Sequence, residues 1–284
     1  MWVPLAVVTA VAFALSGSYA KALSRRAHVY VITWAMMTLA LPWAAVLLLR
    51  EGMPAVEPGF YRAALASVVL NMVSVTLEVK ALSISPLSLT VPFLAFTPLF
   101  MLVTSLVVLG EVPDAKGLVG IVLVAAGAYA INLEKVRGGL LGPIKAVAKE
   151  PGSRIMLLVA LLWSVSAVYD KVAVLASSPA FYQTFFAAAF GVFYAPFLLV
   201  GLRKTPVASS MVPRLFLIGA ICAVMTLSQF AAIQFTLASY VIAVKRSGMI
   251  VSVILGYLFF KEENLRARLA GVLLMSSGVV LLSV

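Results

Sequence analysis

The chain has 284 residues, of which 63% are hydrophobic and only 11% are charged, and its mean hydropathy is +1.12. A soluble domain carries about 25% charged residues because its surface faces water, so this composition excludes an ordinary soluble protein. The formal net charge of +11 suggests a nucleic-acid partner at first, but the basic residues lie in short loops between apolar runs. That arrangement is typical of a membrane protein, and we expect no nucleic-acid partner.

The apolar runs have the length of transmembrane helices. A span needs about 20 mostly apolar residues, and charges, prolines and glycines separate runs of this size. In chain order the predicted spans are 2–22, 29–49, 60–82, 86–109, 115–133, 154–175, 180–200, 213–236, 239–260 and 265–284. The first run lacks the basic segment that opens a signal peptide, so we expect it to be retained. The sequence predicts an all-α, multi-pass integral membrane protein with ten transmembrane helices.

A polar interruption at 134–153 divides the chain into two halves, 1–133 and 154–284, of five predicted spans each. A shift of 151 residues places LGEVPDAKGLVGIVLVAAG over FKEENLRARLAGVLLMSSG without a gap, and a shift of 150 places FALSGSYAK over WSVSAVYDK. These matches include charged and aromatic positions, so the halves are predicted to be repeats. Because each repeat has an odd number of spans, the second enters the membrane from the opposite side, as in many secondary transporters.

The distribution of lysine and arginine predicts an orientation. These residues are concentrated in the loops that follow the first, third, fifth, seventh and ninth spans. The positive-inside rule places those loops in the cytoplasm and both termini outside.

The doubled order of short motifs resembles the ten-helix EamA-type members of the drug/metabolite transporter superfamily. The likeness is carried by ALSISPLSL, LGE and GLVGIVLVAAG in the first half, and by SYVIAVKRSG, LGYLFFKE and LAGVLLMSSG in the second. It extends over nearly the whole chain. The resemblance implies inverted five-helix repeats around a central cavity, alternating access, a plasma-membrane location, and export of amino acids or related metabolites without ATP. Many such transporters have cytoplasmic termini, so the two arguments about orientation disagree.

Two adjacent cations in the ninth span are the leading candidates for substrate binding. Ionisable groups in the bilayer cost about 2.5–3.5 kcal/mol on insertion scales and usually face an interior cavity. Lys245 and Arg246 lie about seven residues into the span, roughly 10 Å at 1.5 Å per residue. We expect one of them to meet an anionic group such as a carboxylate. Because neighbours on a helix diverge by about 100°, only one of the two is expected to face the cavity. The alternative is neutralisation by helix carbonyls or by Glu78.

Other polar and aromatic side chains within the spans are further candidates for substrate binding. They are Asn71, Glu78, Gln183, Gln229, Tyr19, Tyr169, Trp34 and Trp163. Glu78 aligns with Gln229, so both repeats place a polar side chain there. For each aromatic residue, helix packing or a place in an interfacial belt is the alternative.

Three charged residues near the ends of the first and sixth spans are candidates for coupling or gating. Lys21 and Lys171 are aligned by the repeat and would lie near opposite mouths of one pathway, with snorkelling to the interface as the alternative. Asp170 is predicted to be a proton-coupling site or the salt-bridge partner of a lysine.

Two repeated sets of residues are expected to be structural. Glu111 and Glu262 precede the last span of each half, where a carboxylate stabilises a helix start. The glycines of those spans would let the neighbouring helix approach closely; they are Gly120, Gly127, Gly271 and Gly278.

Other functional classes fit the sequence less well. Tyr169–Asp170 has no second GxGD motif for an intramembrane aspartyl protease, and no GxxxxGK[ST] motif indicates an ATP-driven pump. One cysteine, Cys222, and one histidine, His28, offer no disulfide framework or metal-ligand set, so no cofactor is expected. A membrane channel and a non-transporting membrane subunit stay open. The expected partners are a small-molecule substrate, the lipid bilayer and protons, with the chain a monomer or a weak homodimer.

Overall fold

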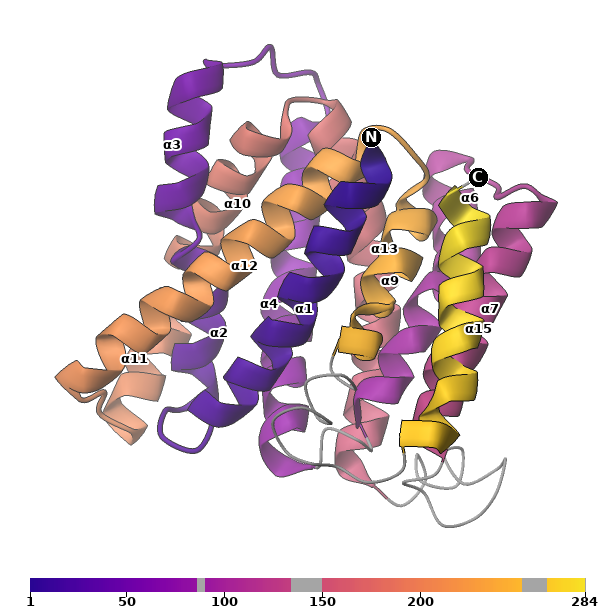
Figure 1. The fold of residues 1–284 in the computed structure, drawn as a ribbon. Helices are drawn as coiled ribbons and strands as arrows, with labels where there is room; N and C mark the ends of the chain where they lie inside the picture. Colours follow the sequence, from indigo (N-terminus) through magenta and orange to yellow (C-terminus); the bar gives the residue numbers. More distant parts are fainter. Residues whose placement is uncertain (86–89, 134–149, 252–264, 284) are drawn as a thin grey trace.

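A computed structural model describes residues 1–85, 90–133, 150–251 and 265–283, and the chain folds into a bundle of helices with both termini at the same end (Figure 1). The first repeat contains α1 (Trp2–Leu23), α2 (Val29–Thr38), α3 (Leu41–Glu51), α4 (Phe60–Ile84), the 3-10 helix η1 (Val91–Phe96), α6 (Thr97–Leu109) and α7 (Ala115–Leu133). The second contains α9 (Pro151–Leu175), α10 (Pro179–Phe193), α11 (Ala195–Lys204), the 3-10 helix η3 (Ser209–Met211), α12 (Val212–Ile233), α13 (Ala238–Arg246) and α15 (Leu265–Ser283).

The predicted all-helical membrane fold is confirmed, and every predicted span contains at least one of these helices. Five segments of the described chain are long and apolar enough to cross a membrane, or six if the bent pair α10–α11 is one span. The five are Trp2–Leu23, Val29–Glu51, Phe60–Ile84, Pro151–Leu175 and Ser209–Ile233. Shorter apolar helices cover Phe93–Leu109, Ala115–Ala130 and Ala270–Ser283.

Two predicted spans are interrupted. The helix of span 29–49 breaks between Thr38 and Leu41, and α10 meets α11 at an angle of 55°. Pro42 and Pro196 stand in the first turn of the second helix of each pair. A proline lacks an N–H group and clashes with the carbonyl four residues before it, which is why each helix breaks just ahead of the proline.

Two other predicted spans are described only in part. In span 86–109, residues 86–89 lie outside the described ranges, and the rest forms η1 followed by α6. In span 239–260, α13 ends at Arg246, and residues 252–264, including Glu262, lie outside the described ranges. So does most of the connecting segment 134–153.

The homologous helices α7 and α15 lie side by side and run antiparallel (Figure 1). A Cβ atom added to Gly120 would lie 3.1 Å from the carbonyl oxygen of Gly278, and one added to Gly127 would lie 2.6 Å from that of Gly271. The residue number therefore rises along one helix as it falls along the other, as inverted repeats require. The predicted role of these glycines in close packing is confirmed.

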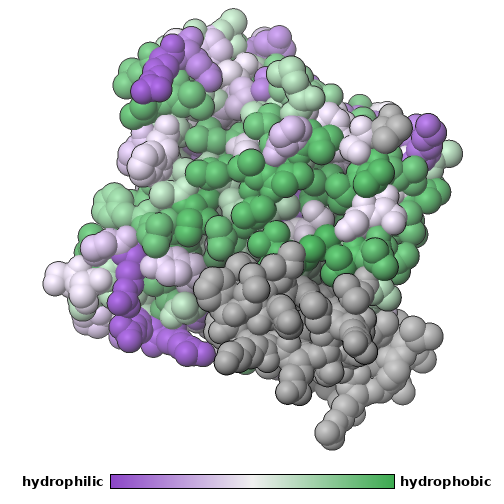
Figure 2. Space-filling view, viewed as in Figure 1, coloured by the Kyte–Doolittle hydropathy of each residue, from purple (hydrophilic) through white to green (hydrophobic). Residues whose placement is uncertain are grey.

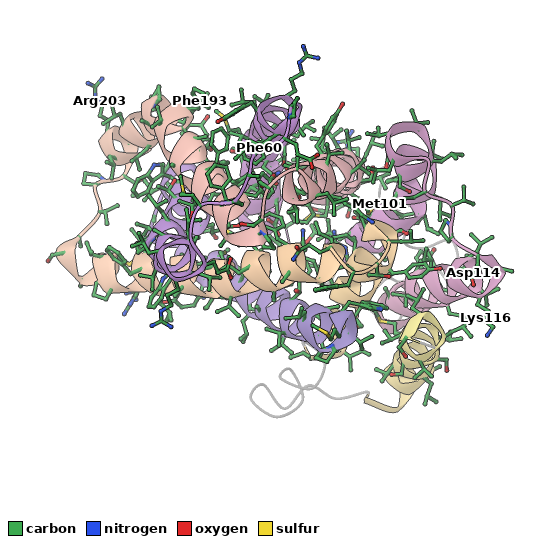
Figure 3. The ribbon with its side chains drawn as sticks, turned by 90° about the horizontal axis from the view of Figure 1, so that it is seen from above. Phe60, Met101, Asp114, Lys116, Phe193 and Arg203 are labelled. Carbon is green, nitrogen blue, oxygen red and sulfur yellow. The ribbon has the colours of Figure 1, made fainter. Side chains whose placement is uncertain are left out.

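The other contacts between the repeats follow the same symmetry. α1 packs along α12, and its counterpart α9 packs along α4, the counterpart of α12. Figure 2 shows apolar side chains across the middle of the described surface and hydrophilic ones toward its upper and lower edges. Seen from above in Figure 3, Lys116 and Arg203 lie at opposite margins of the molecule. The face seen in Figure 2 thus carries an apolar band of the kind that contacts lipid.

Candidate functional site

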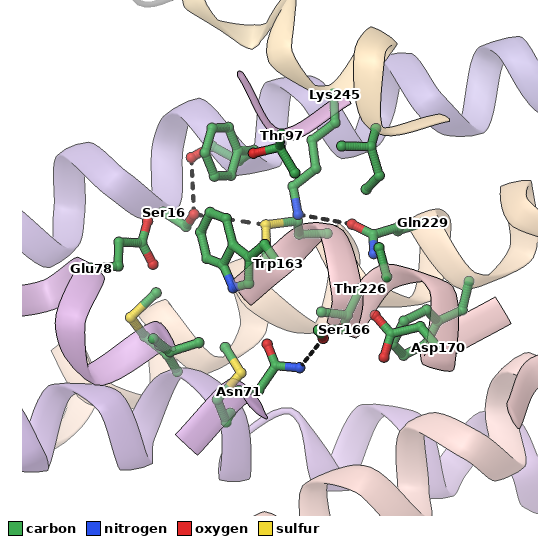
Figure 4. A pocket seen from close by; sticks show the side chains of 18 of the residues that line it. Ser16, Asn71, Glu78, Thr97, Trp163, Ser166, Asp170, Thr226, Gln229 and Lys245 are labelled. Atoms are coloured by element: carbon green, nitrogen blue, oxygen red, sulfur yellow. Dashed lines mark hydrogen bonds between the residues drawn. The ribbon is translucent and has the colours of Figure 1, made fainter. Parts of the chain in front are cut away.

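A pocket lies between the two repeats and is lined by helices of both (Figure 4). Its walls come from α1, α2, α4 and α6 of the first repeat, and from α9, α10, α12 and α13 of the second. The free space is about 60 Å³, enough for a few water molecules at roughly 10–15 Å³ each. A larger solute would require the helices around the pocket to move apart.

Both cations of α13 line this pocket, so the expectation that only one of them would face it is wrong. Lys245 and Arg246 are 7% and 1% exposed. They lie in the last turn of α13, where their long side chains reach the same two aromatic rings. The Lys245 Nζ atom is 5.1 Å from the ring centroid of Phe13, and the guanidinium carbon of Arg246 is 4.9 Å from it.

The two rings are themselves a pair aligned by the repeat. Phe13 of α1 and Trp163 of α9 meet edge to face, with ring centroids 6.2 Å apart and an interplanar angle of 72°. Lys245 Nζ lies 5.6 Å and the Arg246 guanidinium 5.1 Å from the Trp163 ring. Because a cation is attracted to the face of an aromatic ring, this pair holds both charges at the interface between the repeats.

The guanidinium of Arg246 is only partly satisfied. Its Nη2 atom donates to the Thr97 hydroxyl at 3.0 Å. Its Nε and Nη1 atoms are buried and have no hydrogen-bond acceptor among the residues that the structure describes. Buried donors without acceptors cost free energy, and a charged group costs more. The site can therefore donate to an acceptor that enters the pocket.

Lys245 and Glu78 complete one side of the pocket. The Lys245 ammonium donates to Gln229 Oε1 at 2.8 Å. Glu78 is 4% exposed and interacts electrostatically with Lys245 and Arg246. Within the described ranges, no hydrogen-bond donor contacts the Glu78 carboxylate. Glu78 and Gln229, which the repeat aligns, thus both interact with Lys245.

Asp170 lies in a buried hydrogen-bonded network between α4 and α9. Its Oδ1 atom accepts from the Ser67 hydroxyl and, at 2.6 Å, from the Tyr182 hydroxyl. Asn71 donates to Ser166 at 2.5 Å and to the Ser67 carbonyl at 3.0 Å. These bonds fix the Asp170 carboxylate at the edge of the pocket.

The structure brings together seven of the predicted site residues and leaves six outside the pocket. Those lining it are Asn71, Glu78, Trp163, Asp170, Gln229, Lys245 and Arg246. Of the others, Tyr19 and Tyr169 pack against the hydrophobic core, and the Trp34 indole donates to the Gly191 carbonyl at 3.4 Å. Gln183 is buried in α10 away from the pocket.

The two candidate gating lysines also lie outside the pocket lining, at the ends of helices. Lys21 donates to the carbonyls of Leu82 and Ser85 at 2.5 and 2.6 Å. Lys171 forms an ion pair with Glu111 and donates to the carbonyl of Thr236 at 2.8 Å. The predicted role of Glu111 at the start of α7 is therefore wrong.

Asp114 stabilises the start of α7 in place of Glu111. Its Oδ1 atom accepts the backbone N–H of Gly117 at 2.8 Å and the Tyr240 hydroxyl at 3.0 Å. These two hydrogen bonds hold the pKa of the exposed Asp114 carboxyl below its usual value, and the bond from the Gly117 backbone has the larger effect. Asp114 directly precedes the helix, whereas Glu111 is close enough to the other repeat to meet Lys171.

Sequence reasoning missed several residues of the pocket. Phe13 and Ser16 line it together with their aligned partners Trp163 and Ser166, and Thr97 orients Arg246. The repeat alignment carried a usable signal, because in inverted repeats aligned positions on α1 and α9 meet at the same central interface. No signal of that kind marked Thr97, which aligns with Gly248.

Comparisons with known proteins give the following matches. The model of the EamA-like transporter family matches residues 1–133 and again residues 151–284. A comparison with the curated proteins finds no match. A solved structure described only as "Crystal structure of protein" is similar in fold, with a TM-score of 0.72 at 15% sequence identity. That match covers 99% of this chain and 94% of the other.

Proposed function

Because the chain belongs to the EamA-like transporter family, we propose that it is a secondary transporter that exports amino acids or related small organic solutes by alternating access. The chain is a multi-pass membrane protein, and we place it in the plasma membrane. In this proposal residues 1–133 and 154–284 are the moving repeats, joined by 134–153. Both repeats that line the pocket belong to one chain, and we propose that it works as a monomer or a weak homodimer.

The observation that supports this solute class is the unsatisfied guanidinium of Arg246. A carboxylate entering the pocket would accept from the donors that have no acceptor among the described residues, and charge-assisted bonds of this kind are the strongest that side chains make. Lys245 supplies a second positive charge beside it. The pocket therefore favours a solute that carries an anionic group.

The rest of the lining suits the apolar part of such a solute. Met36 and Phe186, which the repeat aligns, line the pocket together with Phe13, Trp163 and Phe230. Pockets for small molecules commonly combine apolar walls with a few placed polar groups. We propose protons as the coupling ion, because Glu78 and Asp170 bring two carboxylates to the pocket.

Counterflow in proteoliposomes tests the proposal. Vesicles that contain the protein and unlabelled L-alanine should accumulate external labelled L-alanine with saturable kinetics. Arg246→Gln should lower that uptake at least tenfold, because the substitution removes the charged donors of the site. Arg203→Gln, at an exposed position on the margin of the molecule (Figure 3), is the matched control and should leave uptake unchanged.

The alternatives give different results in the same vesicles. A channel would show a solute-independent ion current without counterflow, and a non-transporting subunit would show neither. Equal uptake by Arg246→Gln and the unmodified chain would contradict the proposed site.

A further inference from the structure

We propose that Glu78 takes up one proton when a monoanionic solute binds at Arg246, so that the occupied pocket stays electrically neutral. This inference rests on the proposed function. It assigns the proton to Glu78, whereas the sequence predicts Asp170 as the candidate for proton coupling.

The first step is the balance of charge in the pocket. Among the described residues that line it, two are acids, Glu78 and Asp170, and two are bases, Lys245 and Arg246. All four side chains are more than nine-tenths buried. Their formal charges cancel, as burial requires, because an uncompensated charge away from water is strongly unfavourable.

A bound anion breaks this balance. A solute with one negative charge gives the pocket a net charge of −1, whereas a zwitterion brings its own compensating cation. In this formal count Arg246 and Lys245 carry their protons, which leaves the two carboxylates as the groups that can take up another. Neutrality is restored when one of the two carboxylates binds a proton from the solution on the open side.

Hydrogen bonding decides which carboxylate does so. Asp170 accepts hydrogen bonds from the hydroxyls of Ser67 and Tyr182, and donors that point at a carboxylate stabilise its charged form. No donor among the described residues contacts Glu78, which relies on the electrostatic attraction of Lys245 and Arg246. An anion at Arg246 competes for that attraction, so Glu78 is the group that binds the proton.

The titratable groups that interact with Glu78 come from two helices. They are Lys245 and Arg246 of α13 and Cys222 of α12. The Cys222 thiol is fully buried. Asp170 lies across the pocket from Glu78 (Figure 4).

Two ligands of nearly the same shape test the inference on the full chain. L-lactate is an anion and L-alanine a zwitterion, and they differ mainly at one substituent. Binding of each is measured by calorimetry in detergent, and proton uptake by a pH dye in weakly buffered solution near pH 7.5. Lactate should bind with uptake of close to one proton, so its Kd should rise about tenfold per pH unit, and alanine should bind with none.

Variants of Glu78 assign the proton. Glu78→Gln should bind lactate without proton uptake and with a Kd that does not change with pH, whereas Glu78→Asp, which keeps the carboxyl group, should retain the uptake. Uptake that persists in Glu78→Gln overturns the assignment. So does lactate binding to the unmodified chain without uptake, a result that needs no variant to fold. If neither ligand binds, the proposed solute class fails and this inference fails with it.

Discussion

Lys21 and Lys171, which the repeat aligns, donate to backbone carbonyls that the repeat also aligns. The Lys21 ammonium lies 2.6 Å from the carbonyl oxygen of Ser85, and that of Lys171 lies 2.8 Å from the carbonyl oxygen of Thr236. Each lysine thus connects the first helix of its repeat to the residues that follow a later helix of the same repeat. Lys21 connects α1 to the end of α4, and Lys171 connects α9 to the end of α12. Only Lys171 also has a described acidic partner in the other repeat, Glu111.

The Lys171–Glu111 ion pair is expected to hold the repeats together at the end of the molecule where α9 stops. Glu111→Gln should weaken this contact by about 2 kcal/mol. A change of that size shifts the equilibrium between repeats in contact and repeats apart at this end by roughly thirtyfold. The reporter of access is a cysteine in the pocket, Thr226→Cys, in a protein that also carries Cys222→Ala. We expect a water-soluble thiol reagent to modify this cysteine at least several times faster with Glu111→Gln than with Glu111 unchanged. Glu51→Gln, at an exposed position of α3, is the control. An unchanged rate would show that the pair does not restrict access.

Thr97 is expected to position Arg246 for the solute. Thr97→Val removes the hydroxyl that accepts from Nη2 while keeping the side-chain shape. Loss of this bond, worth about 1–2 kcal/mol, should raise the Kd for L-alanine roughly five- to thirtyfold with little change in melting temperature. Thr97→Ser keeps the hydroxyl and should bind as the unmodified chain does. If Ser and Val variants bind alike, the hydroxyl has no role in positioning.

The close packing of α7 and α15 predicts a large effect from one methyl group. In Gly127→Ala the added carbon would lie 2.5 Å from the backbone nitrogen of Met275 and 2.6 Å from the carbonyl oxygen of Gly271, so the helices must separate. Overpacking of this kind costs about 1–3 kcal/mol and should lower the melting temperature. Gly17→Ala is the matched control, because nothing lies within 4 Å of its added carbon. That variant should be neutral or slightly stabilised, since alanine favours a helix over glycine; equal effects would refute the packing argument.

Much of this architecture could be predicted because its causes are local or repeated. Hydropathy sets the helices, and the spacing of Gly120 and Gly127 predicted a close contact that the structure contains. The asymmetry of the two repeats could not be predicted in this way. Asn71 aligns with Cys222, and Asp170 aligns with Ala20, so the hydrogen bonds that Asn71 and Asp170 make between α4 and α9 have no equivalent at those two positions of α1 and α12. Which partners Asp170 and Lys171 meet depends on side chains from distant helices, and no spacing in the sequence encodes those contacts.

His28 gives a prediction about pH outside the spans. Its Nδ1 atom accepts the backbone N–H of Tyr30 at 3.3 Å and caps α2, which only the neutral imidazole can do. Burial and the nearby Lys204 hold the pKa of His28 below its usual 6.5. The cap is therefore fully present above about pH 6.5 and is lost as the pH falls through the lowered pKa. A cap contributes about 1 kcal/mol, and thermal melting in detergent between about pH 7.5 and 5 measures its loss. His28→Asn keeps a capping side chain that does not titrate, so its melting temperature should fall less over this range, whereas parallel curves for the two proteins would mean that His28 protonation does not affect the fold.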